Sequence, residues 1–405
     1  MYLFCFDSNL YNLYFYIDDF SFSMVFLSMW LLMLILSINF NSLLKSFFIV
    51  YSFLVVLLFF CVSSMIMFFI FFELMLVPLF SFIIFFGNQP ERLKAGRWMM
   101  MYTLVGSVPF LISLCYLYGN CINNFGLVPV FFSLGGSPFI DHEVYLFFIM
   151  GFLIKIPLFL THSWLPKAHV EAPLEGSMIL AGIMLKVGVF GMVRFFVMIP
   201  GFFKSNLSFI LFCLGLFGCM AVSFFSIMSD DMKMSVAYSS VSHMNFLICG
   251  LLSMKFMGIK SCLIIMISHG LCSCLLFLIV TFIYMKVGSR SLLMSKGFFS
   301  IYPLGMFINF ISWVMNMSVP PFFSFLGELM CFGSSLSVFP MSIFFMLLYI
   351  LFNSFFSLLN YGYHSHSMSF PLSNVSGFPI SFMILSFMLA FPLLFLFFFD
   401  FLFLM

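Results

Sequence analysis

Long apolar runs separated by short polar segments make up most of the chain. A helix that crosses a membrane needs about 20 mainly apolar residues, because the hydrocarbon layer is about 30 Å thick and each helical residue rises about 1.5 Å. We therefore predict an all-α polytopic membrane protein with about 12 transmembrane helices. The twelve apolar stretches lie near residues 23–43, 47–65, 66–86, 99–118, 144–165, 173–198, 206–228, 234–254, 260–285, 300–334, 341–359 and 377–400.

Two of these stretches are not simple helices, because each contains proline beside a polar segment or within an overlong run. Proline removes a backbone hydrogen-bond donor and clashes with the preceding turn. Pro157 lies in the fifth stretch, and a polar segment from Thr161 to Ser177 follows it. Pro320 and Pro321 lie inside the tenth stretch, which is overlong. Backbone broken at membrane depth is tolerated only where protein or water satisfies its polar groups, and broken helices in transporters mark the transport pathway. We predict two broken helices that line such a pathway.

The first residues differ from the rest of the chain. Residues 1–22 are aromatic but are interrupted by Asp7, Asn9 and Asn12, so we expect an interfacial segment there and a single transmembrane domain over residues 23–405. The first basic residue is Lys45, and nothing before it resembles a transit peptide or a charged signal sequence. Together with 68 Phe and 35 Met, this favours a chain made inside an organelle with an AT-rich genome.

Composition excludes several classes of function. Apolar residues make up 64% of the chain and charged residues 7%, against about 45–50% and about 25% in soluble domains. This excludes a soluble enzyme, a nucleic-acid binder, a disordered chain and a disulfide-stapled secreted domain. The eleven cysteines include no CxxC, and Cys272 and Cys274 do not share a helix face. With no nucleotide loop either, we expect no metal and no cofactor in this chain, and lipids as its only small-molecule neighbours.

Basic residues are distributed unequally between the loops on the two sides of the predicted membrane. By the positive-inside rule the side with more of them faces the matrix or cytoplasm, and both termini then face outward. The richer side receives Lys45, Arg92, Lys94, Arg97, Lys167, Lys233, Lys286, Arg290 and Lys296, and the other side receives Arg194, Lys204, Lys255 and Lys260.

Four charged residues lie near the middle of predicted spans: Glu73, Lys155, Lys186 and Glu328. Each costs on the order of 2.5–3.5 kcal/mol on insertion scales, so their presence needs a reason. One interpretation is two structural salt bridges between helices. The other is proton exchange, because burial and a nearby opposite charge shift the proton affinity of a lysine or a glutamate in opposite directions.

Two histidines, His243 and His269, also lie in mid-span, on two further helices. Histidine is suited to relay protons because its ordinary pKa is near 6.5. A hydrogen-bonded packing role is equally open for each ring, since Ser242, Asn245 and Ser268 lie nearby in the sequence.

Six motifs in the same order resemble the antiporter-like membrane subunits of respiratory complex I, over about residues 18–366. That resemblance implies a bundle of about fourteen helices whose seventh and twelfth helices are broken and form proton half-channels. The matching stretches are FFELMLVP (Phe71 to Pro78), GNQPERLKAG (Gly87 to Gly96), FLIKIPLFLTHSWLPKAHVEAPLEGSMILAGIMLKVG (Phe152 to Gly188), DMKMSVAYSSVSHM (Asp231 to Met244), ISHGLCSCLLF (Ile267 to Phe277) and SVPPFFSFLGEL (Ser318 to Leu329).

The resemblance also implies roles for single residues. The family's functional positions fall on Glu73, Lys155, Lys186, His243, His269 and Glu328. Glu328 is typical of one branch, because sister subunits usually carry lysine there. Two features depart from the family. Glu73 lies so near the start that about two N-terminal helices are missing, and we expect lipid or an accessory subunit to cover the exposed groove. Glu175 replaces a small residue at the entrance to the sixth span.

The function implied is proton translocation across the mitochondrial inner membrane, coupled to electron transfer from NADH to ubiquinone. The chain would act as part of an NADH:ubiquinone reductase without performing the redox chemistry. Its expected partners are the other membrane-arm subunits, especially neighbouring antiporter-like ones, and lipids, with no nucleic acid. Alternatives are a subunit of a cation/proton antiporter, the corresponding subunit of a plastid relative that oxidises ferredoxin, or a scaffold that has lost pumping. A scaffold predicts that the central charges drift, yet this sequence keeps all four.

Overall fold

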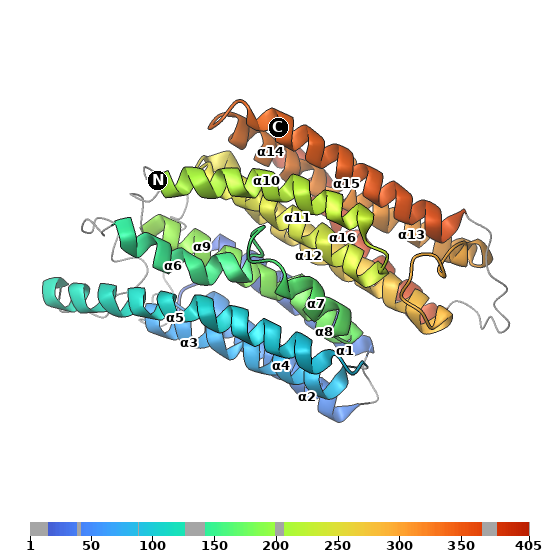
Figure 1. Cartoon of the computed structure of the whole chain (residues 1–405), viewed down its shortest axis with the longest axis horizontal. Coiled ribbons are helices and arrows are strands. Elements are labelled where there is room, and N and C mark those ends of the chain that lie inside the picture. The colour runs from blue at the N-terminus through green and yellow to red at the C-terminus, as the bar shows by residue number, and fades with distance from the viewer. Residues whose placement is uncertain are drawn as a thin grey trace. The chain divides into compact units, whose positions relative to one another are not determined.

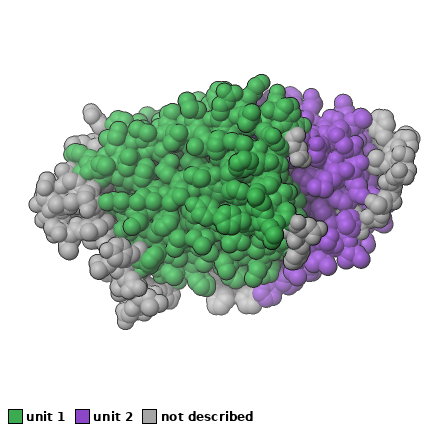
Figure 2. All heavy atoms as spheres, turned by 90° about the horizontal axis from the view of Figure 1, so that it is seen from below, with its two compact units in different colours: residues 1–164, 171–211 green, residues 165–170, 212–405 purple. Residues whose placement is uncertain are grey.

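The computed structural model describes residues 15–38, 42–87, 89–125, 142–198, 206–366 and 379–404, and every regular element in these ranges is helical (Figure 1). The chain forms two compact units (Figure 2). Unit 1 contains residues 1–164 and 171–211, and unit 2 contains residues 165–170 and 212–405.

Unit 1 holds the first half of the helices, and close packing of small residues brings its helices together. A Cβ atom at Gly106 would lie 3.3 Å from the Cα atom of Gly151, so α5 and α6 approach backbone to backbone. The helices are α1 (Asp19–Ile38), α2 (Leu43–Cys61), α3 (Met65–Leu74), α4 (Leu76–Phe86), α5 (Arg92–Phe125), α6 (His142–Lys155), α8 (Leu174–Ile179), the π-helix η1 (Leu180–Met184) and α9 (Leu185–Met198).

Unit 2 is organised around α12, which packs against both α11 and α14. Two helices, α7 (Trp164–Glu171) and α10 (Asn206–Met228), cross the boundary between the units. The others in unit 2 are α11 (Met232–Leu252), α12 (Phe256–Val287), η3 (Phe298–Ile301), α13 (Pro303–Asn316), α14 (Phe323–Leu336), α15 (Ser342–Ser365) and α16 (Ile380–Leu404).

The predicted all-α polytopic fold is confirmed. Among the described residues, nine helices are long and apolar enough to cross a membrane, and shorter apolar helices accompany them. The boundaries differ by a few residues from those predicted: the first helix begins at Asp19 rather than near residue 23, and α5 extends from Arg92 to Phe125. Residues 1–14 of the predicted interfacial segment 1–22 lie outside the described residues.

Both predicted breaks are present. The helix α6 ends at Lys155, two residues before Pro157, and α7 does not begin until Trp164. Between α13 and α14, the segment from Met317 to Phe322 contains Pro320 and Pro321, and Ser318 has a positive φ of 55°. Proline at these positions leaves carbonyl groups without a backbone donor, so the chain leaves the helical path.

Two further irregularities are not evident from the apolar pattern. The helix is interrupted between α3 and α4, at Met75, two residues after Glu73, because Pro78 has no N–H to donate to the carbonyl of Leu74. A π-helical turn, η1, ends at Met184, two residues before Lys186. Such turns are rare and occur often at functional sites.

Candidate functional site

In unit 1, Lys155 and Glu73 meet at the interruption between α3 and α4. The side chain of Lys155, the last residue of α6, is only 4% exposed. Its ammonium group donates a hydrogen bond to the carbonyl oxygen of Phe72 and lies 3.1 Å from the centroid of the Phe72 ring. Glu73 interacts electrostatically with Lys155, and the Ser107 hydroxyl lies near its carboxylate. The interruption between α3 and α4 thus brings a lysine and a glutamate close enough to interact electrostatically.

The Glu73 carboxylate is not saturated with hydrogen bonds. Its Oε1 atom is buried and receives no hydrogen bond from the described residues. A buried polar atom without a partner is unfavourable, and water or a proton is what normally satisfies it. The Glu73 carboxylate can therefore bind a proton or accept a hydrogen bond from another donor at its Oε1 atom.

Lys186 is the second residue of α9 and is completely buried. Its ammonium group donates a hydrogen bond to the carbonyl oxygen of Ala181, inside the π-helical turn. A Cβ atom at Gly188 would lie 3.2 Å from the Cβ atom of Lys155, so α9 packs directly on the end of α6. The two lysines of unit 1 are therefore carried by segments in contact.

In unit 2, Glu328 of α14 lies at the centre of a hydrogen-bonded group. Its Oε1 atom accepts a hydrogen bond from Ser318 Oγ at 2.7 Å and one from the Tyr349 hydroxyl at 3.4 Å. The same atom lies 3.3 Å from Nδ1 of His243, and the Tyr349 oxygen lies 2.8 Å from that nitrogen. The carboxylate, the imidazole and the phenol thus form one hydrogen-bonded cluster.

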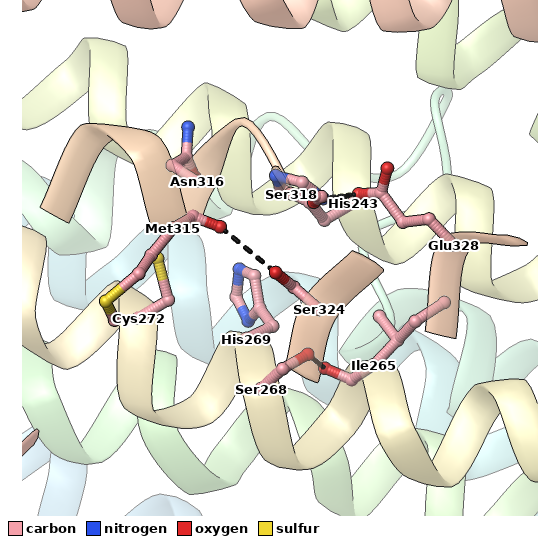
Figure 3. Close-up of a pocket in the computed structure, with 10 residues that line it drawn as sticks. All are labelled: His243, Ile265, Ser268, His269, Cys272, Met315, Asn316, Ser318, Ser324 and Glu328. Carbon is pink, nitrogen blue, oxygen red and sulfur yellow. Dashed lines mark hydrogen bonds and ion pairs between the residues drawn. The ribbon is translucent and has the colours of Figure 1, made fainter. Parts of the chain in front are cut away.

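His269 extends this cluster into a small cavity. Its ring centroid lies 5.7 Å from that of His243. The cavity measures about 20 Å³, which is enough for one water molecule. Figure 3 shows His269 beneath the break between α13 and α14, where Ser324 Oγ donates to the carbonyl of Met315 at 3.3 Å. The cavity is lined by His243, Ile265, Ser268, His269, Cys272, Met315, Asn316, Ser318, Ser324 and Glu328.

The polar residues near the two histidines in the sequence bond to backbone carbonyls. The hydroxyls of Ser242 and Ser268 donate to carbonyls of their own helices, those of Ser239 and Ile265. The Asn245 amide likewise donates to Val241. The His243 imidazole instead contacts a phenol and a carboxylate, groups with which it can exchange a proton.

Other charges form closed pairs away from these clusters. The unexpected Glu175 is paired with Lys45, with 3.4 Å between Nζ and Oε1. Arg194 and Asp18 form an ion pair in which both side chains are less than 10% exposed. No group of three His, Cys, Asp or Glu side chains in the described ranges could hold a metal ion.

Of the six predicted site residues, the structure brings Glu73 together with Lys155, and His243 and His269 together with Glu328. Lys186 belongs to unit 1 with the first pair. Glu73, Lys155 and Lys186 belong to unit 1, and His243, His269 and Glu328 belong to unit 2. Sequence reasoning missed Tyr349 and Ser318. The signal for Ser318 was its place just before the two prolines, and Tyr349 begins a series of buried polar residues on α15.

Comparison with known proteins places the chain among membrane subunits of related complexes. The family model described as NADH:quinone oxidoreductase/Mrp antiporter, TM, matches residues 62–357. A protein of Locusta migratoria named NADH-ubiquinone oxidoreductase chain 4 is 39% identical over 373 residues, which cover 89% of this chain and 82% of that protein. Its counterpart of the same name from Ceratitis capitata is 36% identical over 385 residues, covering 93% of this chain and 85% of that one.

Two solved structures share the fold. A chain of respiratory complex I from Thermus thermophilus with bound NADH superposes with a TM-score of 0.85 at 22% identity, covering 94% of this chain and 81% of that chain. A chain of the Mrp complex from Dietzia sp. DQ12-45-1b gives a TM-score of 0.84 at 16% identity, covering 96% of this chain and 82% of that one. Because the family model matches well over half of the chain, this chain belongs to the family of NADH:quinone oxidoreductase/Mrp antiporter membrane subunits.

Proposed function

We propose that this chain is the proton-translocating core subunit of mitochondrial complex I that corresponds to chain 4. In this function it moves protons across the inner membrane while NADH reduces ubiquinone elsewhere in the complex. The chain is then part of an NADH:ubiquinone reductase but carries no redox chemistry and no cofactor. The insect relatives named chain 4 and the Glu328 position support this branch of the family.

One observation carries the proposal: Lys155 is buried at a helix break beside Glu73. A lysine there holds its proton with a strength that depends on how near the carboxylate lies. A charge that crosses the full field against 100 mV works against about 2.3 kcal/mol. One pKa unit corresponds to about 1.36 kcal/mol, so a displacement that changes the lysine's affinity by two units suffices to switch it between loading and release.

The cluster in unit 2 provides the second element of the mechanism. Glu328 accepts a proton, and His243 and Tyr349 lie close enough to pass it on. The cavity beside His269 has room for the water that such a relay uses. Lys186 would load and release in the same way as Lys155, because it is also a buried lysine bound to a backbone carbonyl.

The proposed partners are the other membrane-arm subunits, in particular the neighbouring antiporter-like subunits, together with lipids. Large apolar side chains remain exposed on α1, among them Phe22, Phe26 and Met33. In a bilayer these positions meet lipid or another subunit. The two structural neighbours are chains of proteins named respiratory complex I and Mrp complex, which supports assembly with other subunits.

A subunit of a cation/proton antiporter is the competing function, since the Mrp chain shares the fold. Co-purification separates the two. The chain isolated from mitochondria should migrate with a flavin- and iron–sulfur-containing NADH dehydrogenase. Isolation in a complex without redox proteins would favour the antiporter, and isolation with ferredoxin-oxidising activity would favour the plastid relative.

The proton-transfer role is tested with Glu73→Gln in the whole complex reconstituted into vesicles. The change removes the anion beside Lys155 and keeps its size, so we expect quinone reduction and proton uptake to fall together. NADH oxidation by ferricyanide, which needs no proton pumping, should persist. Glu91→Gln is the matched control, because Glu91 is exposed. Normal proton uptake with Glu73→Gln would overturn the proposal.

A further inference from the structure

The turn that joins α11 to α12 is short and tightly packed. Ser253, Met254 and Lys255 separate the two helices. The Met254 backbone has a positive φ of 49°, and the Ser253 hydroxyl donates a hydrogen bond to the carbonyl of Gly250 at 2.7 Å. A Cβ atom at Gly258 would lie 2.3 Å from that carbonyl oxygen, so the two helices contact each other backbone to backbone beside the turn. The turn therefore holds the side chains that it exposes in fixed positions.

Two cations and two apolar side chains are exposed together on this turn and at the start of α12. Lys255 and Lys260 are exposed, and Phe256 and Met257 are 41% and 50% exposed. The Lys260 ammonium lies 4.4 Å from the centroid of the Phe256 ring, which directs it back toward the turn. We call these four residues the basic tip: Lys255, Phe256, Met257 and Lys260.

The two lysines of the basic tip are free to bind an anion from outside the chain. No carboxylate oxygen in the described ranges lies within 4.0 Å of either ammonium group. Other cations are neutralised, since Arg194 is paired with Asp18. Both lysines of the basic tip also belong to the side of the membrane that receives fewer basic residues, so the positive-inside rule does not account for them.

The length of α12 places the basic tip at the level of the lipid headgroups. The helix segment from Lys260 to Lys286 measures about 39 Å at about 1.5 Å per residue. A bilayer is about 30 Å thick across the hydrocarbon and about 40–45 Å thick with its headgroups. The ammonium groups near the two ends of α12 therefore reach the headgroup layers of opposite leaflets. By the positive-inside rule, the basic tip lies in the outward-facing leaflet.

We propose that the basic tip binds the phosphate group of an anionic phospholipid in the outward-facing leaflet. The ammonium groups of Lys255 and Lys260 donate charge-assisted hydrogen bonds to the phosphate oxygens. Phe256 and Met257 pack against the glycerol and the first carbons of the acyl chains. Phosphatidylglycerol and diphosphatidylglycerol fit this site, because phosphatidylcholine carries its own cation beside the phosphate. No covalent bond changes, and binding here is independent of proton transfer by the chain.

A protein with an acidic surface is the competing occupant, because carboxylates would pair with the same two lysines. Lipid is favoured by the depth of the basic tip and by its composition. Lysine beside exposed phenylalanine is typical of segments that lie at a membrane surface, where the cation meets anionic headgroups and the apolar side chain enters the acyl boundary. Inorganic phosphate offers the same anion but no acyl chain for Phe256 and Met257.

The test uses the whole complex in detergent with photoreactive phospholipids, and peptide mass spectrometry locates the crosslinks. We expect phosphatidylglycerol to label the peptide that contains the basic tip, and phosphatidylcholine with the same acyl chains to label it much less. Inorganic phosphate at the same concentration should not compete. The internal control is α15, which exposes Leu351 and Phe355 but carries no lysine or arginine, so both lipids should label it equally.

Charge variants test the two lysines directly. Lys255→Gln combined with Lys260→Gln should reduce labelling of the basic tip by phosphatidylglycerol roughly tenfold or more, because each cation near the membrane surface strengthens binding of an anionic lipid. Lys255→Arg combined with Lys260→Arg keeps both charges and should retain the labelling. Labelling of α15 should be unchanged in both double variants.

Equal labelling of the basic tip by the two lipids would overturn the proposal, as would labelling that persists in the glutamine double variant. Competition by inorganic phosphate would show a site for a free anion instead of a lipid. Coupling of Lys255 or Lys260 to a carboxylate of another subunit by a carbodiimide would identify an acidic protein as the occupant, and the lipid site would then be wrong.

Discussion

At the scale of single residues, the buried charges of this chain have two kinds of surroundings. Arg194 and Asp18 form a closed ion pair, in which each charge is neutralised by the other. Glu328 instead shares one oxygen atom with a serine, a phenol and an imidazole, none of which carries a permanent positive charge. The second setting surrounds the carboxylate with groups that can both donate and accept hydrogen bonds, whereas the first holds it by a permanent opposite charge.

Tyr349 provides a test at this scale. Tyr349→Phe removes the hydroxyl that contacts both His243 and Glu328, and keeps the ring that stacks on Phe246 at 5.0 Å. A hydrogen bond to a charged group contributes about 1.5–3 kcal/mol, so we expect quinone reduction to fall by roughly tenfold or more without loss of assembly. Tyr361→Phe on the same helix should leave the rate unchanged. Equal rates for both variants would remove Tyr349 from the relay.

The six proposed site residues could be identified from the sequence because placing a charged or imidazole side chain in a membrane span costs free energy, so such residues are rare there. Tyr349 could not, because a tyrosine in a membrane helix is common, and Ser318 had only its place near the two prolines as a signal. The importance of both residues depends on the carboxylate that they contact, which follows from the packing of α15 and of the break between α13 and α14 around Glu328.

At the scale of elements, helix breaks position the charged groups, and close packing holds the breaks in place. Glu328 follows Gly327 on α14, and this glycine lies against α12. A Cβ atom there would come within 2.8 Å of side-chain atoms of Ile264 and Ile265. The absence of a side chain at this position therefore sets the distance between Glu328 and the histidine of α12, His269.

Gly327→Ala should accordingly displace α14. Overpacking of this kind costs about 1–3 kcal/mol, so we expect a lower thermal denaturation temperature and slower quinone reduction. Gly333→Ala on the same helix is the control, because nothing lies within 4 Å of a Cβ atom at Gly333. Helix propensity alone should make that variant equal or slightly more stable. Wild-type behaviour of both variants would show that α14 does not depend on this contact.

The ion pair between Arg194 of α9 and Asp18, the residue before α1, gives a second prediction at the scale of elements. Asp18→Asn leaves the Arg194 charge buried without its partner, and breaking such a pair costs about 3–5 kcal/mol. We expect a lower yield and a lower denaturation temperature of the complex, measured by heating it and following quinone reductase activity. Asp19→Asn, one residue further along at an exposed position, should have little effect. If both variants are equally stable, the pair does not anchor α1.

Helix breaks differ in how far sequence predicts them. The breaks at Pro157 and at Pro320 and Pro321 follow from proline chemistry in overlong or polar-flanked runs, and both are present. The π-helical turn before Lys186 has no comparable residue signal, because it arises from a shift in backbone hydrogen bonding within an ordinary apolar stretch.

At the scale of the whole molecule, three of the six proposed site residues lie on the most enclosed spans. The spans that carry Lys186, His243 and His269 are 100%, 94% and 89% buried over their most apolar windows, whereas the other candidate spans in the described ranges are 33–44% buried. Apolar sequence alone does not separate lipid-facing helices from enclosed ones, because lipid and protein interior are both apolar. A charged residue within a run does not make that distinction by itself either, since Glu73 lies on a span that is 44% buried.

The most direct test of proton translocation by this chain is proton uptake by the assembled complex carrying Lys186→Ala. Lys186 is completely buried, and the proposed function assigns it the binding and release of a proton. We predict that the variant assembles, retains NADH oxidation by ferricyanide, and loses most of its quinone-coupled proton uptake, while Lys94→Ala at an exposed position pumps normally. Unchanged proton uptake per quinone reduced in assembled Lys186→Ala complex would contradict this role.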